Sequence, residues 1–103
     1  MTSRLEGLKD LLAQTPDDPE LHYLIANEYF SAGQYEECIR EMELYLGQAD
    51  DEGAAYRTLA RAYDALGKRS EARQTYEAGV RAARKHNHPG MAQEFEAALK
   101  EWD

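Results

Sequence analysis

Two groups of side chains in this chain have residue types that bind metal ions. His86 and His88 are two residues apart, but no third or fourth ligand lies near them, as a zinc site would need. The second group is the acidic run Asp50, Asp51 and Glu52, which lacks the regular oxygen spacing of a calcium loop. We therefore predict no metal site.

The thiol of Cys38, the only cysteine, is the one candidate nucleophile. It falls on the packed face of a predicted helix, where a small residue is required, and buried thiols are generally inert. The sequence contains no phosphate-binding glycine loop, nucleophile elbow or catalytic triad signature. We therefore predict that the protein is not an enzyme, has no catalytic residues and needs no cofactor.

Charge is distributed unevenly along the 103 residues, which carry a formal net charge of −8. Residues 1–56 carry −10 and residues 57–103 carry +2. An acidic chain disfavours nucleic acids and anionic membranes as partners. No apolar run approaches the ~18 residues of a membrane span. A lone cysteine and the lack of a signal peptide lead us to expect a soluble, cytoplasmic protein.

Apolar residues recur at three- and four-residue steps along most of the chain, which indicates amphipathic helices and no strands. Pro16, Gly33, Gly67 and Pro89 interrupt this pattern, and Asp17 or Asp18 can cap the helix that starts near residue 19. The predicted helices cover about residues 3–14, 19–32, 35–48, 55–66, 69–86 and 89–102.

Gly33 and Gly67 are 34 residues apart, and the residues around them repeat at the same spacing. The other matched pairs are Ile25 and Leu59, Ala26 and Ala60, Tyr29 and Tyr63, Glu37 and Glu71, Cys38 and Ala72, and Met42 and Tyr76. The small members of these pairs let two helices approach closely. A helical period of 34 predicts a solenoid of stacked helix hairpins.

This pattern of small and large residues resembles the tetratricopeptide repeat family. The resemblance implies an all-α, right-handed α-α superhelix of stacked antiparallel helix pairs, forming a single domain over residues 1–103. Within it we expect a half repeat at 3–14, full repeats at 19–52 and 53–86, and a C-terminal capping helix at 89–102.

In that family the first helix of each pair lines a concave groove that holds a peptide or partner protein. The groove residues that the resemblance implies here are Tyr23, Asn27, Phe30, Arg57 and Arg61. The two arginines are one helical turn apart, and arginine forks match carboxylates well. We therefore predict a protein–protein interaction module of the scaffold or adaptor type, whose partner carries at least one carboxylate.

The chain departs from the family pattern at several positions. His22 stands where tryptophan is often found. Family members that clamp the acidic tails of heat-shock chaperones have a lysine where this chain has Tyr23, although Asn27 matches an asparagine of that clamp. The basic residues of the clamp's third repeat have no counterpart, so we do not predict a chaperone clamp.

Self-association is the alternative function. The first helix lacks the hairpin partner of a complete repeat, which leaves Leu5, Leu8 and Leu12 as a contact stripe. A second contact region is the last helix near Trp102. Under this alternative the chain forms a weak homodimer or part of a larger assembly.

Overall fold

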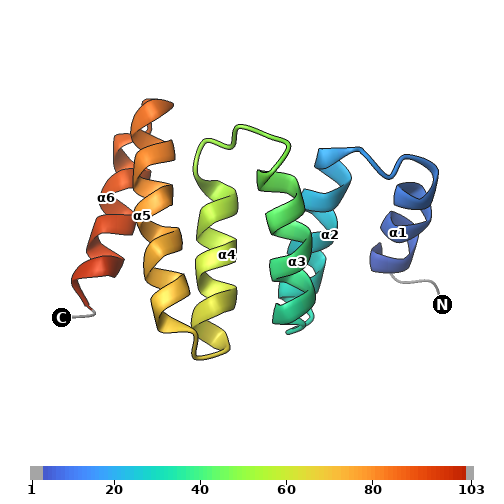
Figure 1. The fold of residues 1–103 in the computed structure, drawn as a ribbon, viewed down its shortest axis with the longest axis horizontal. Coiled ribbons are helices and arrows are strands. Elements are labelled where there is room, and N and C mark those ends of the chain that lie inside the picture. The colour runs from blue at the N-terminus through green and yellow to red at the C-terminus, as the bar shows by residue number, and fades with distance from the viewer. Residues whose placement is uncertain (1–3, 102–103) are drawn as a thin grey trace. The chain divides into compact units, whose positions relative to one another are not determined.

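A computed structural model describes residues 4–101 of the chain. This range contains helices and no strand (Figure 1), so the all-α prediction is confirmed. Trp102 lies outside the described residues. The helices are α1 Arg4–Gln14, α2 Pro19–Ser31, α3 Tyr35–Leu46, α4 Ala54–Ala65, α5 Arg69–Lys85 and α6 Pro89–Lys100.

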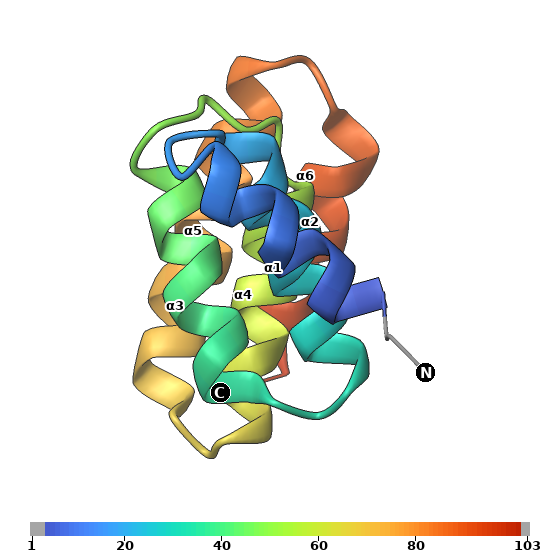
Figure 2. The same cartoon turned by 90° about the vertical axis from the view of Figure 1, so that its right-hand side faces the viewer.

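The chain divides into two compact units, residues 1–49 and residues 50–103. In the first unit α2 and α3 form an antiparallel hairpin, and α1 packs on α2 (Figures 1 and 2). In the second unit α4 and α5 form the equivalent hairpin, and α6 packs on α5. Each predicted repeat therefore gains one additional helix within its own unit.

The two hairpins reverse direction in the same way. Gly33 and Gly67 have φ angles of 74° and 75°, in the left-handed region that residues with a Cβ atom disfavour. In each case the amide of the following residue donates a 2.9 Å hydrogen bond to a tyrosine carbonyl four residues before the glycine. The predicted role of these glycines as helix terminators is confirmed.

Asp18 caps the N-terminus of α2. Its side chain accepts a 3.0 Å hydrogen bond from the amide of Glu20, and Pro19 occupies the first turn. Of the two aspartates that the sequence offered for this role, the structure therefore uses the second, because only Asp18 directly precedes the first helical residue.

The buried carboxylate of Asp51 organises the start of α4. It accepts hydrogen bonds from the amides of Gly53, at 2.8 Å, and Ala55, at 2.9 Å. Gly53 has φ 142°, and a Cβ atom there would collide with the side chain of Met91 on α6. Asp51, the middle residue of the acidic run, thus has a structural role in beginning this helix.

Small residues lie where the paired helices meet. Ala26 and Cys38 in the first hairpin, and Ala60 and Ala72 in the second, are all completely buried. Because alanine and cysteine have small side chains, helix backbones can approach closely at these points. The small residues that the sequence singled out are therefore fully buried, as close helix contacts require.

Phe95 is the centre of the second unit. This fully buried side chain of α6 lies against Gly79 of α5, and its ring centroid is 5.8 Å from that of Tyr76. A Cβ atom at Gly79 would stand 2.8 Å from the Phe95 ring and 3.1 Å from the Cβ of Tyr56. The absence of a side chain at residue 79 is what admits the aromatic ring.

Two helical glycines should therefore respond in opposite ways to alanine. Alanine is favoured over glycine inside a helix by about 1 kcal/mol, and Gly7 of α1 has nothing within 4 Å of a new Cβ atom. Gly7→Ala should raise the free energy of unfolding. Gly79→Ala should lower it, because displacing a packed ring costs ~1–3 kcal/mol. Urea unfolding measures both, and stabilisation by Gly79→Ala would contradict the packing described.

Candidate binding surfaces

The predicted groove residues of the first unit lie together on α2. Tyr23, Asn27 and Phe30 follow one another at steps of four and three residues, and each side chain is half-buried. The Tyr23 ring lies 4.9 Å from that of Tyr45, and the Phe30 ring lies 5.4 Å from that of Tyr35. Both aromatic residues therefore also hold α2 against α3, while part of each ring stays exposed.

The predicted arginines of the second unit lie on α4, and the first of them already binds a carboxylate. Nε of Arg57 donates to Oε2 of Glu94 at 2.6 Å, and its Nη2 donates to Oε1 at 2.8 Å. The same guanidinium stands 5.7 Å from the centroid of the Phe95 ring. This two-pronged geometry is the one in which arginine recognises carboxylates most strongly.

Arg61 adds a second positive charge near the same carboxylate. The hydrogen bond from Arg57 lowers the pKa of Glu94, partial burial opposes this, and the charges of Arg57 and Arg61 lower it further. Burial raises the pKa of Tyr76, and the charge of Arg61 moderates that rise. Arg61 itself is exposed to solvent. The two arginines thus both stabilise the charged form of Glu94.

The structure brings the predicted residues together in two groups, one in each unit. The aromatic and amide group lies on α2, and the arginine pair lies on α4. Glu94 was not among the predicted residues. It is 37 residues from Arg57 and belongs to α6, which does not follow the 34-residue pattern, so no signal in the sequence pointed to it.

Cys38 is not a nucleophile in this fold. Its side chain is fully buried in α3, and burial raises the pKa of its thiol to about 11. A thiolate is the reactive form of cysteine. The burial of Cys38 agrees with the expectation that this position requires a small, packed residue.

The histidines near the start of α6 pair with acidic residues of the second unit. Nε2 of His86 lies 3.3 Å from Oδ2 of Asp50, which also binds Nζ of Lys85 at 3.1 Å. Nε2 of His88 lies 3.4 Å from Oε2 of Glu52. Within residues 4–101, no three histidine, cysteine, aspartate or glutamate side chains converge as metal ligands.

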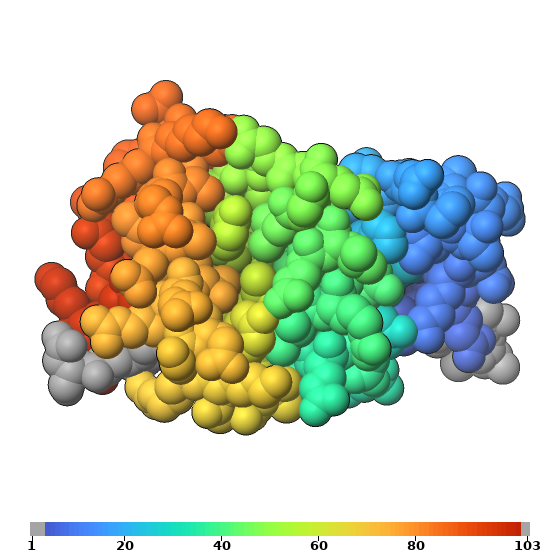
Figure 3. Space-filling model, in the orientation of Figure 1, coloured from blue at the N-terminus to red at the C-terminus, as the bar shows by residue number. Residues whose placement is uncertain are grey.

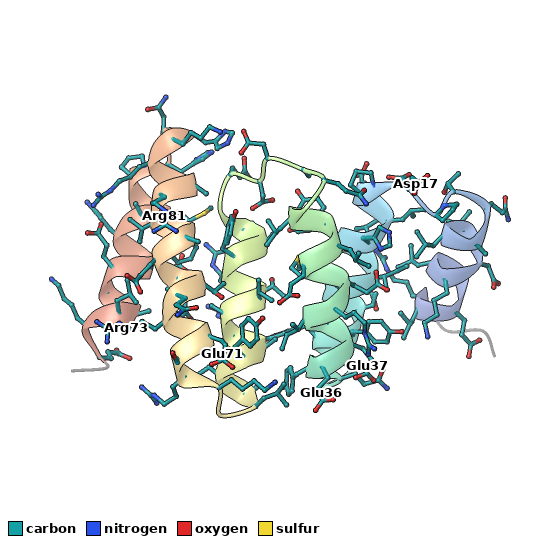
Figure 4. All side chains as sticks on the ribbon, viewed as in Figure 1. Asp17, Glu36, Glu37, Glu71, Arg73 and Arg81 are labelled. Atoms are coloured by element: carbon teal, nitrogen blue, oxygen red, sulfur yellow. The ribbon has the colours of Figure 1, made fainter. Side chains whose placement is uncertain are left out.

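The second helices of the two hairpins differ in charge, although α5 also carries the acidic Glu71. Glu36 and Glu37 project near the beginning of α3, whereas Arg73 and Arg81 project from α5 (Figure 4). Side chains of α5 cover one face of the second unit (Figure 3). These arginines lie on a different helix from Arg57, which makes Arg81 a useful comparison for any test of the α4 surface.

Comparisons with known proteins agree with this architecture. The chain matches the tetratricopeptide repeat family over residues 5–60 and again over 30–99. It is 27% identical over 99 residues to TPR repeat-containing protein PA0015 of Pseudomonas aeruginosa, and the match covers 96% of this chain and 94% of that protein. The solution structure of protein BPP2914 from Bordetella parapertussis has the same fold, with a TM-score of 0.84 and 24% sequence identity, covering 98% of this chain and 88% of that one.

The chain belongs to the tetratricopeptide repeat family. Proteins of this family act generally as scaffolds for protein–protein interaction, and the predicted helical repeat superhelix is confirmed. No helix within the described residues has both the length and the apolar character needed to cross a membrane.

The burial of Cys38 predicts a thiol that reacts only after unfolding. At pH 8 a thiol with a pKa of about 11 is ionised in roughly one molecule in a thousand. An aromatic disulfide reagent should therefore label Cys38 in urea and leave the native chain unlabelled for hours. Leu44→Cys provides the control, since Leu44 is exposed on the same helix. Native labelling of both thiols at equal rates would contradict this prediction.

Proposed function

We propose that the protein binds an acidic, partly apolar segment of a partner protein through the first helices of its repeats. On the second unit, Arg57 and Arg61 contact the partner's carboxylate. On the first unit, taken by itself, Tyr23 and Phe30 offer apolar surface and Asn27 offers hydrogen bonds. The observation that carries this proposal is the two-pronged contact of Arg57 with Glu94, because a carboxylate already fits that guanidinium.

The carboxylate of Glu94 affects how tightly a partner can bind. A partner's carboxylate competes with Glu94 for Arg57, or shares the positive field that Arg61 extends from its exposed position. Because Glu94 is itself substantially exposed, exchange of one carboxylate for another costs little desolvation. Binding should be modest, on the order of micromolar, equivalent to about 8 kcal/mol.

Charge also limits which partners fit. Residues 1–56 carry −10, so a uniformly acidic segment is repelled by the first half of the chain. A ligand that combines carboxylates with apolar side chains avoids this repulsion. Long-range attraction contributes little at cellular salt, because the Debye length is ~10 Å at 0.1 M.

The competition between Glu94 and the partner can be tested with two substitutions of opposite effect. Arg57→Gln should weaken capture of partners from a native lysate by about tenfold or more, because the carboxylate contact is lost. Glu94→Gln should strengthen it, because Arg57 is released from its internal partner. Quantitative mass spectrometry of the captured proteins measures both effects.

Arg81→Gln is the matched control, since it removes an arginine of α5 from the opposite hairpin helix and should leave capture unchanged. If the ion pair acts only by holding α6 in place, both substitutions will weaken capture equally, and the proposal fails. Circular dichroism verifies that each variant keeps its helices.

Self-association is a second candidate function, favoured by exposed leucines on the first unit. Leu11 of α1 is 51% exposed and Leu44 of α3 is 45% exposed. Leu5, Leu8 and Leu12, which the sequence singled out, are half-buried. The exposed leucines are therefore better contact residues for a second copy than the stripe predicted from the sequence.

Sedimentation velocity at rising concentration tests self-association directly. If a homodimer forms through Leu11, Leu11→Ser should shift the monomer–dimer midpoint to higher concentration by about tenfold. This is the loss expected from one well-buried leucine contact. A parent chain that stays monomeric at millimolar concentration would remove this candidate.

A further inference from the structure

His22 is a buried histidine whose two ring nitrogens both face hydrogen-bond acceptors. Its side chain is 8% exposed. Nδ1 lies 2.5 Å from Oε2 of Glu41 on α3, and Nε2 lies 3.0 Å from the carbonyl oxygen of Pro16 in the turn between α1 and α2. The ring therefore connects three parts of the first unit: the turn, α2 and α3.

This arrangement determines the protonation state of the ring. A neutral imidazole has one donor nitrogen and one acceptor nitrogen. A carbonyl oxygen and a carboxylate can only accept, so the pair of contacts requires a proton on each nitrogen of His22. The alternative, a protonated Glu41 beside a neutral ring, places the proton on the more acidic of the two groups, since carboxyl groups ionise near pH 4 and histidine near 6.5.

The charged groups around the ring favour its positive form. Burial on its own lowers the pKa of His22, but the hydrogen bonds to Glu41 and Pro16 and the negative charges of Glu41 and Asp18 outweigh it, so the pKa is raised. Glu41 acts from α3, and Asp18 acts from the N-terminal cap of α2. From α1, two charged side chains contact α2: Lys9 lies over the Tyr29 ring at 5.1 Å, and Arg4 pairs with Glu28.

α1 contains no buried residue, but its half-buried leucines pack on α2. Its polar contacts with α2 include an ion pair of 2.8 Å between Arg4 and Glu28, and the contact of Lys9 with Tyr29. An exposed ion pair of this kind contributes at most about 1 kcal/mol. The hydrogen bond of His22 to Pro16, two residues beyond the end of α1, adds a contact that fixes the turn leading from α1 into α2.

We propose that His22 is a buried imidazolium that fastens α1 to the α2–α3 hairpin, and that its deprotonation at alkaline pH releases α1. A neutral ring can donate to only one of its two acceptors. The carboxylate of Glu41 is the stronger acceptor, so the contact with the Pro16 carbonyl is lost first. Release of α1 uncovers the side of α2 that carries Glu28 and Tyr29.

The direction of the pH dependence follows from linkage. Because the pKa of His22 is raised in the folded chain, its stabilising effect is complete below about pH 6.5, the value of an unfolded histidine. The effect is lost as pH rises through the folded value. The first unit should therefore loosen between neutral and alkaline pH.

Two measurements on the full chain test the proposal. Nuclear magnetic resonance titration should give His22 a pKa above 6.5. Amide hydrogen exchange, corrected for the intrinsic effect of pH, should show protection of α1 falling as the pH rises above about 6.5, relative to α1 of the His22→Gln variant. The expected fall is about tenfold for each pKa unit by which His22 is raised.

Substitutions distinguish a titrating role of His22 from a role in packing alone. His22→Gln keeps two side-chain N–H donors without a titratable ring, so the pH dependence of α1 should disappear. If that variant does not fold, Glu41→Gln should lower the pKa of His22 and shift α1 release to lower pH. His88→Gln, which removes a histidine of the second unit, should leave α1 unchanged. A pKa of His22 at or below 6.5, or an unchanged pH profile in His22→Gln, would overturn the proposal.

Discussion

Close approach of helix backbones is the constraint on which both units depend. Ala26 and Cys38 permit it in the first hairpin, and Ala60 and Ala72 permit it in the second. Such contacts leave no space for a larger side chain, so a larger residue would push the two helices apart. The glycines that end α2 and α4 complete the constraint, because they reverse the chain within the few residues that a close hairpin leaves available.

α6, which the repeat pattern does not include, also depends on close approach to a neighbouring helix. Gly79 opens α5 to the ring of Phe95, and that packing fixes the position of α6. Glu94 precedes Phe95 in the chain, so a purely steric contact determines where its carboxylate lies. The charge environment of Arg57 is therefore a consequence of a glycine one helix away.

The additional helix of the first unit buries no residue, whereas that of the second unit buries Ala92 and Phe95. His22 and Glu41 form an ion pair with low exposure, and such pairs are poor sources of net stability, because desolvation offsets most of the attraction. Their value lies in specificity, since three segments must meet in one geometry to satisfy both ring nitrogens. These contacts fix the turn from which α1 leads into α2, and so add to the contacts that α1 itself makes with α2.

Much of this fold was determined by sequence alone, and the reason is physical. Helical periodicity, the 34-residue spacing and the small residues at the contacts are local or repeated properties, so the roles of Gly33, Gly67, Ala26 and Ala60 could be assigned from the order of residues by itself. The contacts of Arg57 with Glu94 and of His22 with Glu41 join residues 37 and 19 positions apart and follow no period. Only tertiary packing decides which side chains of different helices meet, and it alone decided that a predicted ligand-binding arginine already holds a carboxylate of its own chain.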